Sequence, residues 1–388
     1  MHVLAAAVAS LALSLAAPAP TTTSVGVFSD QLPDALPPAL VRFAATHYAG
    51  AQKLSRTTTL ALKRQNPRFF ALQYRLALGV GRTTQVRFGD AWKPEWPSHP
   101  QEPWFFHWHG SRVLDKTNGW YLMNVDDGGW RSYYVAKLHQ QVATTDADGA
   151  FLDSASVPTY FGAIWTPQLP PVDAAFEAAW SNRIARWLAT VQRRLGIPVV
   201  ANAGSWVTTR DRTDYSGVAG VMIEGFATNL APADWQLELT RAVRLVRKDK
   251  IVIAQSYPAV EDVQARMFDL ASYLLIKGAH TYLNFPIDIE VDLFPEYGVD
   301  LGAAVDPPGL RVQDGAYVRR YAKGLIAANP GDAPVTLQLD GAYERVLPQG
   351  GGRVPATGVL PAAWTLVRTP LGESLTLAPR EGAVLLNT

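Results

Sequence analysis

The sequence predicts a (β/α)₈ barrel, or TIM barrel, that is followed by a small C-terminal antiparallel β-sandwich. From residue 40 onward, short runs rich in β-branched and aromatic residues alternate with segments of helical periodicity. Eight such runs within roughly 270 residues are typical of a closed barrel. After about residue 310 the runs have a period of two and are separated by Pro- and Gly-rich turns. We therefore expect the barrel over residues 21–310 and the sandwich over residues 311–388.

The expected barrel strands are eight: Val41–Gln52, Phe69–Leu76, Gly119–Val125, Gly149–Leu152, Ile197–Ala201, Gly217–Ile223, Lys250–Ala254 and His280–Asn284. Strands that alternate with helices lie parallel and are joined by right-handed crossovers. An open doubly wound sheet would call for a Gly-rich phosphate-binding turn after its first strand. The segment Gly50-Ala51-Gln52-Lys53 is not such a turn, so the closed barrel is favoured.

Three of the intervening segments carry clear helix signals. Val172–Leu195 places an apolar stripe opposite several arginines, and Gly196 ends it. Ala233–Val246 begins after a proline and ends in basic residues, which suits the helix dipole. Val260–Ile276 repeats this pattern. These segments predict the helices that cover the barrel.

The first 20 residues are typical of a signal peptide. An apolar run rich in Ala, Leu and Val extends to Ala17, which is too short to span a bilayer, and small residues that suit cleavage follow it. No Lys or Arg precedes the run, and a buried first helix is the alternative. We expect a secreted or periplasmic monomer with no membrane association beyond export.

Composition narrows the class of ligand. The net charge of +1 provides no global field for nucleic acid or an anionic membrane, so we expect no nucleic-acid partner. Cysteine is absent, which excludes disulfides, thiolate metal sites and a Cys nucleophile. Of 12 tryptophans, all but Trp364 lie in the barrel region, where flat rings could stack on sugars. These features favour a carbohydrate ligand.

Two carboxylates directly follow buried strands of the expected barrel. Asp153 comes after Ala150-Phe151-Leu152, and Glu224 comes after Val221-Met222-Ile223. Reacting groups of such barrels lie at the carboxyl ends of the strands, and glycoside hydrolysis needs two carboxyl groups. We assign Asp153 as nucleophile, because a short carboxylate near Arg75 could stay ionised, and Glu224 as acid/base. The alternatives are a loop or cap acid for the first and a structural ion pair for the second.

Further polar and aromatic side chains follow the strand ends, where they could bind a neutral polyol. The candidates are Gln52, Arg75, Trp104, His107, Asn124, Asp126, Asn202, Tyr257 and Asn284. Asp127 is expected to cap the Gly128-Gly129 turn instead. His107 and His109 lack a placed third ligand, so we expect no metal and no organic cofactor.

Several motifs resemble the hypothetical glycosyl hydrolase family 15, a family of bacterial barrel proteins distinct from the glucoamylases. They are Trp104-Phe105-Phe106-His107, Gly149-Ala150-Phe151-Leu152-Asp153-Ser154, Val221-Met222-Ile223-Glu224-Gly225 and Phe294-Pro295-Glu296-Tyr297-Gly298. The resemblance implies a retaining pair of carboxylates on strands four and six, as in barrels related to α-galactosidases, and an α-linked substrate. The sequence departs from the family at His107-Trp108-His109, where an acid would be expected after the first His.

The sequence thus predicts a glycoside hydrolase that cleaves an O-glycosidic bond, and the resemblance implies an α-linked bond and retaining double displacement. Two alternatives stay open. The first is a carbohydrate-binding barrel protein without catalysis, and the second is another barrel enzyme such as a polysaccharide lyase. Isosteric replacement of the two carboxylates would separate a binder, which keeps its affinity, from an enzyme, which loses turnover.

Overall fold

The computed structural model describes residues 25–285 and 289–388, so the expected signal peptide, residues 1–20, lies outside the described residues. The described chain forms two compact units. The first comprises Ala51–Arg64 and Phe70–Met222. The second comprises residues 25–50, Gln65–Phe69 and Ile223–Thr388.

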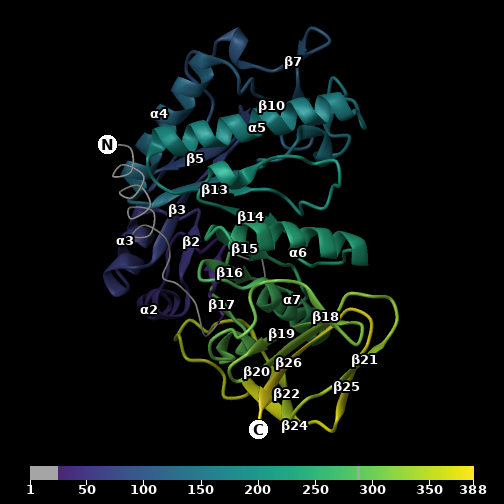
Figure 1. Ribbon diagram of the computed structural model, residues 1–388. Coiled ribbons are helices and arrows are strands. Elements are labelled where there is room, and N and C mark those ends of the chain that lie inside the picture. Colours follow the sequence, from purple (N-terminus) through teal and green to yellow (C-terminus); the bar gives the residue numbers. More distant parts are fainter. Residues whose placement is uncertain (1–24, 286–288) are drawn as a thin grey trace, which may run out of the picture. The chain divides into compact units, whose positions relative to one another are not determined.

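The predicted barrel is confirmed as an eight-stranded sheet with the order β1-β2-β3-β11-β13-β14-β15-β16 (Figure 1). Neighbouring strands with a defined register pair in parallel, and a parallel bridge between Val27 and Leu283 joins the β1 and β16 ends. The strands are β1 (Phe28–Ser29), β2 (Gly50–Gln52), β3 (Phe70–Leu76), β11 (Gly149–Asp153), β13 (Val199–Asn202), β14 (Gly220–Glu224), β15 (Ile251–Gln255) and β16 (Thr281–Asn284).

Two of the eight predicted barrel strands were wrong. Most of Val41–Gln52 is helix α2 (Pro38–His47), because its apolar residues recur with helical spacing and Pro38 occupies the first turn; only its end forms β2. Gly119–Val125 contains β10 (Trp120–Leu122), which pairs antiparallel with β4 and β9 outside the barrel sheet. The two-residue strand β1 was missed. β11 and β14 nevertheless remain the fourth and sixth barrel strands.

In the first unit, helices α3 (Arg56–Gln65), α4 (Gly128–Thr145) and α5 (Ala174–Leu195) follow the barrel strands. The α5 helix, teal in Figure 1, confirms the prediction for this segment. The Asp173 carboxylate accepts hydrogen bonds from the amides of Ala175 and Phe176, and Gly196 ends the helix in the left-handed conformation at φ 71°. The crossover from β13 to β14 contains only the short 3₁₀ helix η3 (Tyr215–Gly217).

An insertion between β3 and α4 carries short antiparallel strands. Its strands β4 (Gly79–Gly81), β9 (Leu114–Asp115) and β10 form a sheet with β12 (Trp165–Thr166), which lies between β11 and α5; the order of this sheet is β12-β9-β10-β4. Two further hairpins join β5 (Gln85–Phe88) to β6 (Ala91–Pro94), and β7 (His107–Trp108) to β8 (Ser111–Arg112). The short 3₁₀ helix η1 (Glu102–Trp104) precedes β7. The insertion therefore pairs within itself and, through β9, with the loop that follows β11.

In the second unit, α6 (Pro232–Val246) and α7 (Val263–Ile276) agree with the predicted helices. The α7 helix is buried along most of its length, because the C-terminal strands approach it closely. A Cβ atom added at Gly382 on β26 (Glu381–Asn387) would come within 2.4 Å of the Met267 carbonyl oxygen, so only glycine fits there. Within residues 25–285 and 289–388, no helix is long and apolar enough to cross a membrane.

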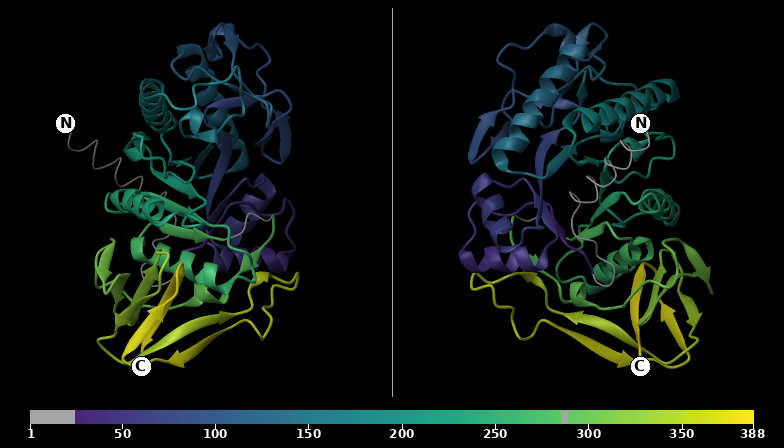
Figure 2. Two further views of the ribbon diagram at one scale, coloured as in Figure 1. Left: turned by 90° about the vertical axis from the view of Figure 1, so that its right-hand side faces the viewer. Right: turned by 60° about the vertical axis from the view of Figure 1, so that its left-hand side comes forward.

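The C-terminal region is the predicted antiparallel sandwich. A six-stranded sheet has the order β18-β19-β20-β26-β22-β24, and β21 pairs with β25 in a second sheet. Figure 2 shows the yellow strands of this region lying beside one another. The strands are β18 (Arg311–Gln313), β19 (Ala316–Tyr321), β20 (Gly324–Asn329), β21 (Val335–Gln338), β22 (Tyr343–Gln349), β24 (Thr365–Pro370), β25 (Ser374–Leu377) and β26. The short strands β17 (Asp292–Leu293) and β23 (Gly352–Arg353), together with the 3₁₀ helix η4 (Pro295–Gly298), link this region to the preceding chain.

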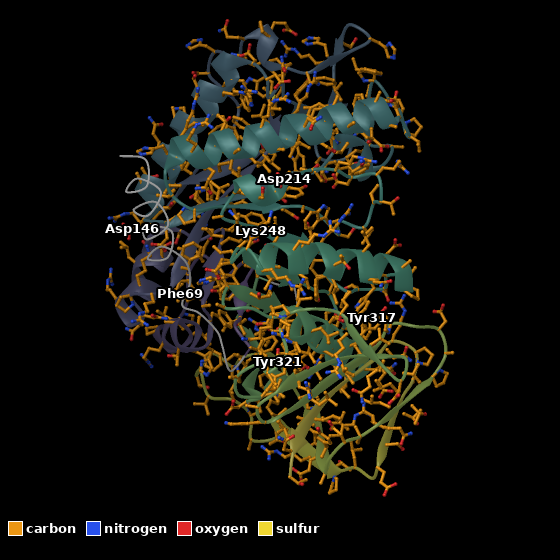
Figure 3. The ribbon with its side chains drawn as sticks, viewed as in Figure 1. Phe69, Asp146, Asp214, Lys248, Tyr317 and Tyr321 are labelled. Carbon is orange, nitrogen blue, oxygen red and sulfur yellow. The ribbon has the colours of Figure 1, made fainter. Side chains whose placement is uncertain are left out.

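Side chains of both C-terminal sheets share one core, which includes Val318, Leu337, Leu377 and Leu385. On the opposite side of β19, the Tyr321 hydroxyl donates to the Leu274 carbonyl oxygen of α7 at 2.7 Å (Figure 3). Tyr317 on the same strand packs its ring 4.9 Å from that of Trp235 on α6. The sandwich is therefore fixed to both helices of the second unit.

A buried carboxyl group on α6 predicts an unusual pH dependence of stability. Burial raises the pKa of Glu238 well above 4.5, and the nearby Asp269 raises it further. The folded chain thus keeps a proton that the unfolded chain releases above pH 4.5, so this group destabilises the fold as the pH rises toward its folded pKa. We expect Glu238→Gln to raise Tm at pH 8 and to have little effect at pH 4. Calorimetry against the exposed control Glu373→Gln checks this, and equal Tm changes at both pH values would contradict it.

Candidate active site

Asp153 is the last residue of β11, and its carboxylate is surrounded by hydrogen-bond donors. The residues before it on the strand are buried, whereas Asp153 itself is half-buried. Its Oδ2 accepts from the Tyr74 hydroxyl at 2.7 Å, and its Oδ1 accepts from Asn202 Nδ2 at 2.8 Å and from the Ser154 amide at 2.7 Å. Three donors on one carboxylate complement a negative charge and fix the orientation of its oxygens.

The backbone around Asp153 is anchored from both neighbouring strands. β11 pairs with β3 so that Asp153 lies opposite Leu76, and the Asp153 carbonyl oxygen accepts from the Ala77 amide at 2.7 Å. On the other side, the Ala155 amide donates to the Asn202 carbonyl oxygen at 3.0 Å. Ser154, directly after the strand, adopts a left-handed conformation at φ 54°. Such strained conformations are rare outside glycine and cluster at functional sites.

Tyr74, which the sequence analysis did not select, lies between Asp153 and a cation. Its ring stacks on Phe151 at 6.1 Å, and the Lys53 ammonium lies 5.1 Å from its centroid. Lys53 follows β2 and also has a left-handed backbone, at φ 62°. Tyr74, Asp153 and Asn202 come from three neighbouring strands of one unit, so the sheet itself sets their spacing.

Arg75 does not take the position beside Asp153 that the sequence suggested. Adjacent residues of a strand point to opposite faces, and Arg75 points toward α4 while Tyr74 reaches Asp153. The buried guanidinium donates to Gln141 Oε1 at 2.8 Å, packs over the Tyr134 ring and lies 4.0 Å from Glu95. Arg75 therefore stabilises the packing of β3 against α4.

Glu224 is the last residue of β14, and in the second unit it is half-buried. The Tyr257 hydroxyl donates to Glu224 Oε1 at 2.9 Å, so the predicted site residues Glu224 and Tyr257 are in contact. Tyr257 comes two residues after β15, and the Phe226 amide donates to the Gln255 carbonyl oxygen at 2.8 Å, which ties the two loops together. Gly225 turns the chain directly after Glu224 with φ 79°.

Two of the predicted binding residues are amides with little exposure. Gln52 on β2 is fully buried. Asn284 on β16 is also buried, and its Nδ2 donates to Gln255 Oε1 at 2.7 Å, so it holds the end of β15. The contact with Gln255 gives the Asn284 side chain a structural role.

Three other predicted binding residues lie in the insertion. The Trp104 ring packs 5.1 Å from that of Tyr133, and Asn124 donates to the Pro103 carbonyl oxygen at 3.3 Å. His107 is exposed and its Nε2 lies 2.8 Å from Glu102 Oε1. Glu102 also pairs with Arg112, and hydrogen bonds from Arg112 and then from His107 lower its pKa to about 2. Among the described residues, no group of three His, Asp or Glu side chains could hold a metal ion.

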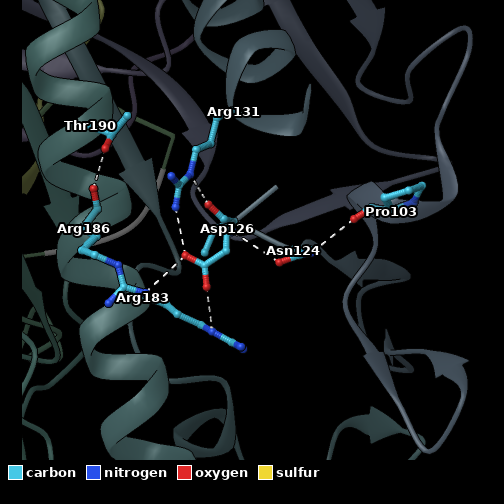
Figure 4. A network of polar contacts seen from close by, with 8 residues as sticks. Pro103, Asn124, Asp126, Arg131, Arg183, Arg186 and Thr190 are labelled. Atoms are coloured by element: carbon cyan, nitrogen blue, oxygen red, sulfur yellow. Dashed lines mark hydrogen bonds and ion pairs between the residues drawn. The ribbon is translucent and has the colours of Figure 1, made fainter. Parts of the chain in front are cut away.

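Asp126 lies at the centre of an arginine cluster in the first unit (Figure 4). Its carboxylate pairs with Arg131 at 2.9 Å, Arg183 at 3.0 Å and Arg186 at 3.3 Å. The neighbouring Asp127 accepts from the Trp130 amide at 2.8 Å and caps α4, which confirms the prediction for this residue. Because three cations already surround Asp126, its contacts are those of an ion-pair centre rather than of a hydroxyl-binding group.

Replacing Asp126 by Asn should destabilise the first unit in a salt-dependent way. The change removes the shared anion and leaves three neighbouring guanidinium groups that repel one another. We expect a loss of about 1–2 kcal/mol at low salt, which added salt would reduce because these side chains are partly exposed. Urea titrations at two salt concentrations measure it. Glu344→Gln, which breaks one exposed pair with Arg368, is the matched control and should change stability less.

The chain matches a known protein family. Residues 63–325, more than half of the chain, match the family described as hypothetical glycosyl hydrolase family 15. Among curated proteins, no match is found.

Solved structures that resemble the chain include two barrel hydrolases. One is a noncanonic maltogenic α-amylase, AmyB, from Thermotoga neapolitana, with 11% identity, 94% of this chain and 99% of that chain covered, and a TM-score of 0.44. Another is the α-galactosidase AgaA from Geobacillus stearothermophilus, with 10% identity, 94% of this chain and 56% of that chain covered, and a TM-score of 0.47.

Proposed function

The chain belongs to hypothetical glycosyl hydrolase family 15 and is a glycoside hydrolase, and we propose that it cleaves an α-linked bond by double displacement. The substrate is an oligo- or polysaccharide, and the anomeric configuration is retained. Asp153 is the nucleophile and Glu224 is the acid/base. The choice of an α linkage follows the resemblance of the sequence motifs to the α-galactosidase-type barrels.

The observation that carries this proposal is the set of donors around Asp153. A nucleophilic carboxylate must be ionised and must hold one oxygen in a fixed direction. The Tyr74 hydroxyl, Asn202 Nδ2 and the Ser154 amide fix the direction of the Asp153 oxygens, and these three donors complement a negative charge. The Tyr257 hydroxyl donates to Glu224 and fixes its Oε1, and the carboxyl group is half-exposed, as proton transfer requires. Both carboxylates end strands of the same parallel sheet, where barrel enzymes carry their reacting groups.

The reaction then proceeds in two balanced steps. In the first, an Asp153 oxygen forms a bond to the anomeric carbon while the bond to the glycosidic oxygen breaks, and the protonated Glu224 gives its proton to that oxygen. In the second, Glu224 takes a proton from water, and the water oxygen replaces Asp153 at the anomeric carbon. The sugar leaves with its original configuration, Asp153 is ionised again and Glu224 is protonated again.

A screen with 4-nitrophenyl glycosides of both anomeric types, followed by proton NMR of the first-formed product, tests the proposal. We expect turnover of an α-glycoside and initial release of the α-anomer. Initial release of the β-anomer from that substrate would refute the double displacement. Turnover of β-glycosides alone would refute the choice of linkage, and turnover of none of the glycosides or of a panel of plant and bacterial polysaccharides would refute the activity.

Replacing Tyr74 by Phe should lower kcat without unfolding the barrel. The change removes one charge-assisted hydrogen bond to Asp153 and keeps the ring that stacks on Phe151. We expect kcat to fall about 10- to 100-fold, the effect of losing one hydrogen bond to a charged group. Tyr317→Phe on β19 is the matched control. Unchanged kcat in the Tyr74 variant, with a normal circular dichroism spectrum, would remove Tyr74 from the site.

We also propose that the protein acts outside the cytoplasm as a monomer. The first 20 residues have the character of a signal peptide, and an exported enzyme would meet polysaccharides directly. N-terminal sequencing of protein recovered from the periplasm or the medium should find a start near residue 20. Retention of Met1 in that fraction would contradict the cleavage, and light scattering would contradict the monomer if it gave a larger mass.

A further inference from the structure

A cavity of about 550 Å³ lies beyond the ends of β14 and β15 in the second unit. Its walls come from three segments: residues 227–229 after β14, residues 257–259 after β15 with the start of α7, and the turn Pro379-Arg380 before β26. All three belong to the same unit. The cavity is therefore formed jointly by barrel loops and the C-terminal sandwich.

One side chain links this cavity to Glu224. Tyr257 lines the cavity, and its hydroxyl donates to Glu224 Oε1 at 2.9 Å. Its amide donates to Thr228 Oγ1 at 3.3 Å, across to the other barrel loop of the cavity. A ligand in the cavity would thus lie one tyrosine ring away from the acid/base of the proposed reaction.

The lining has the mixed character that a sugar ring requires. Phe268 and Pro258 offer apolar surface, while Thr228 and Arg380 offer polar atoms. The buried Asp269 also lines the cavity, and burial raises the pKa of its carboxyl group well above 3.8. Neutral polyols are bound by such combinations of apolar surface and a few convergent polar groups.

The wall after β14 is held in a conformation that the chain adopts rarely. Ala227 and Asn229 have left-handed backbones, at φ 56° and 50°, shortly after Gly225 at φ 79°. A hydrogen bond from the Ala227 amide to the buried Glu238 Oε2 at 2.8 Å holds this segment in place. Alanine has no side-chain group that favours this region, so the loop shape is imposed by its surroundings, as is common beside binding sites.

The wall from the sandwich is also fixed. Gln264 Nε2 on α7 donates to the Pro379 carbonyl oxygen at 3.1 Å, and the Arg380 guanidinium donates to the Leu230 carbonyl oxygen. The turn therefore closes the cavity from a defined position, and the sandwich contributes directly to its shape.

We propose that this cavity binds a neutral sugar unit of the substrate on the leaving-group side of the bond that is cleaved. This inference rests on the proposed function, in which Glu224 protonates the oxygen that joins the two sugar units. The side follows because Glu224 acts on that oxygen and Tyr257 lies between Glu224 and the cavity. The natural substrate is then a chain that extends past the cleaved bond, and the sandwich is part of its binding site.

The experiment compares chain lengths in a cavity-filling variant. Ala265→Trp on α7 places a large ring at the cavity wall without removing a side-chain hydrogen bond. The substrates are oligosaccharides of two to six units and the 4-nitrophenyl glycoside of the sugar that the glycoside screen identifies. In the wild type, kcat/KM should rise about tenfold or more as units are added on the leaving-group side. The variant should lose most of this gain and change much less on the 4-nitrophenyl glycoside.

A second variant guards against misfolding of the first. Arg380→Ala removes a side chain from the cavity wall and should also reduce the rise of kcat/KM with chain length. Arg368→Ala on β24, outside the cavity, should leave that rise unchanged. A full gain in both cavity variants, or no gain in the wild type, would overturn the subsite and leave the proposed function standing. The subsite would also be overturned if the variants lost as much kcat/KM on the 4-nitrophenyl glycoside as on the oligosaccharides. Turnover of no substrate by the wild type would refute the function, and the subsite with it.

Discussion

Replacing Asp153 by Ala is expected to reduce kcat/KM by a factor on the order of 10⁴ or more, because the reaction loses the group that forms the covalent intermediate. The fold should persist, since the side chain is half-buried at the end of β11 and its strand pairing uses backbone groups. Kinetics on a 4-nitrophenyl α-glycoside, with circular dichroism of both proteins, measure the effect. Asp148→Asn, at the other end of the same strand, is the matched control; it pairs with Lys63 and should affect stability rather than kcat.

Azide distinguishes a nucleophile from an acid in this variant. In Asp153→Ala, azide can occupy the space of the lost carboxylate and displace the leaving group of an activated α-glycoside directly. The product would be the β-glycosyl azide, since a single displacement inverts the anomeric carbon. Formation of the α-glycosyl azide would instead mean that a covalent intermediate still forms, and that Asp153 is not the nucleophile.

Sequence periodicity was sufficient for the barrel but not for every strand in it. The parallel strands β11, β13, β14, β15 and β16 are short buried runs, and long helices lie between most of them, so local patterns identify them. Phe28–Ser29 is too short to show any period. Residues 119–125 look like a buried strand, yet they pair with β4 and β9, and a pairing between distant segments leaves no local pattern.

The candidate site was predictable only where a strand ends in a carboxylate. Asp153 and Glu224 stand out because an acid after an apolar run is costly unless it has a role or a partner. The partner of Asp153 was misjudged, since alternation along β3 brings Tyr74 rather than Arg75 to it. Counting from Leu76, which lies opposite Asp153, could have found Tyr74, because residues two apart share a face of the sheet. The ion pairs of Asp126 involve arginines of α5 that are nearly sixty residues away, and no sequence motif reveals such pairs.

Replacing Glu224 by Gln should divide substrates by the quality of their leaving groups. A natural sugar leaving group needs the proton that Glu224 provides, so kcat/KM on an oligosaccharide should fall about 10²- to 10⁴-fold, the usual contribution of general acid catalysis. A 2,4-dinitrophenolate leaves without a proton, so formation of the covalent intermediate from a 2,4-dinitrophenyl α-glycoside should be nearly unchanged. Its hydrolysis should be slow, because glutamine cannot take a proton from water.

This imbalance has a signature that loss of structure would not produce. The variant should release a burst of dinitrophenolate equal to the enzyme concentration and then turn over slowly, as the covalent intermediate accumulates. Azide, which needs no general base, should speed the second phase and give the α-glycosyl azide, the opposite anomer to that expected from Asp153→Ala. The exposed control Glu261→Gln should behave as the wild type. Equal losses of kcat/KM on both substrates without a burst would show that Glu224 supports the site but transfers no proton. The assignment of Glu224 as acid/base would then be wrong.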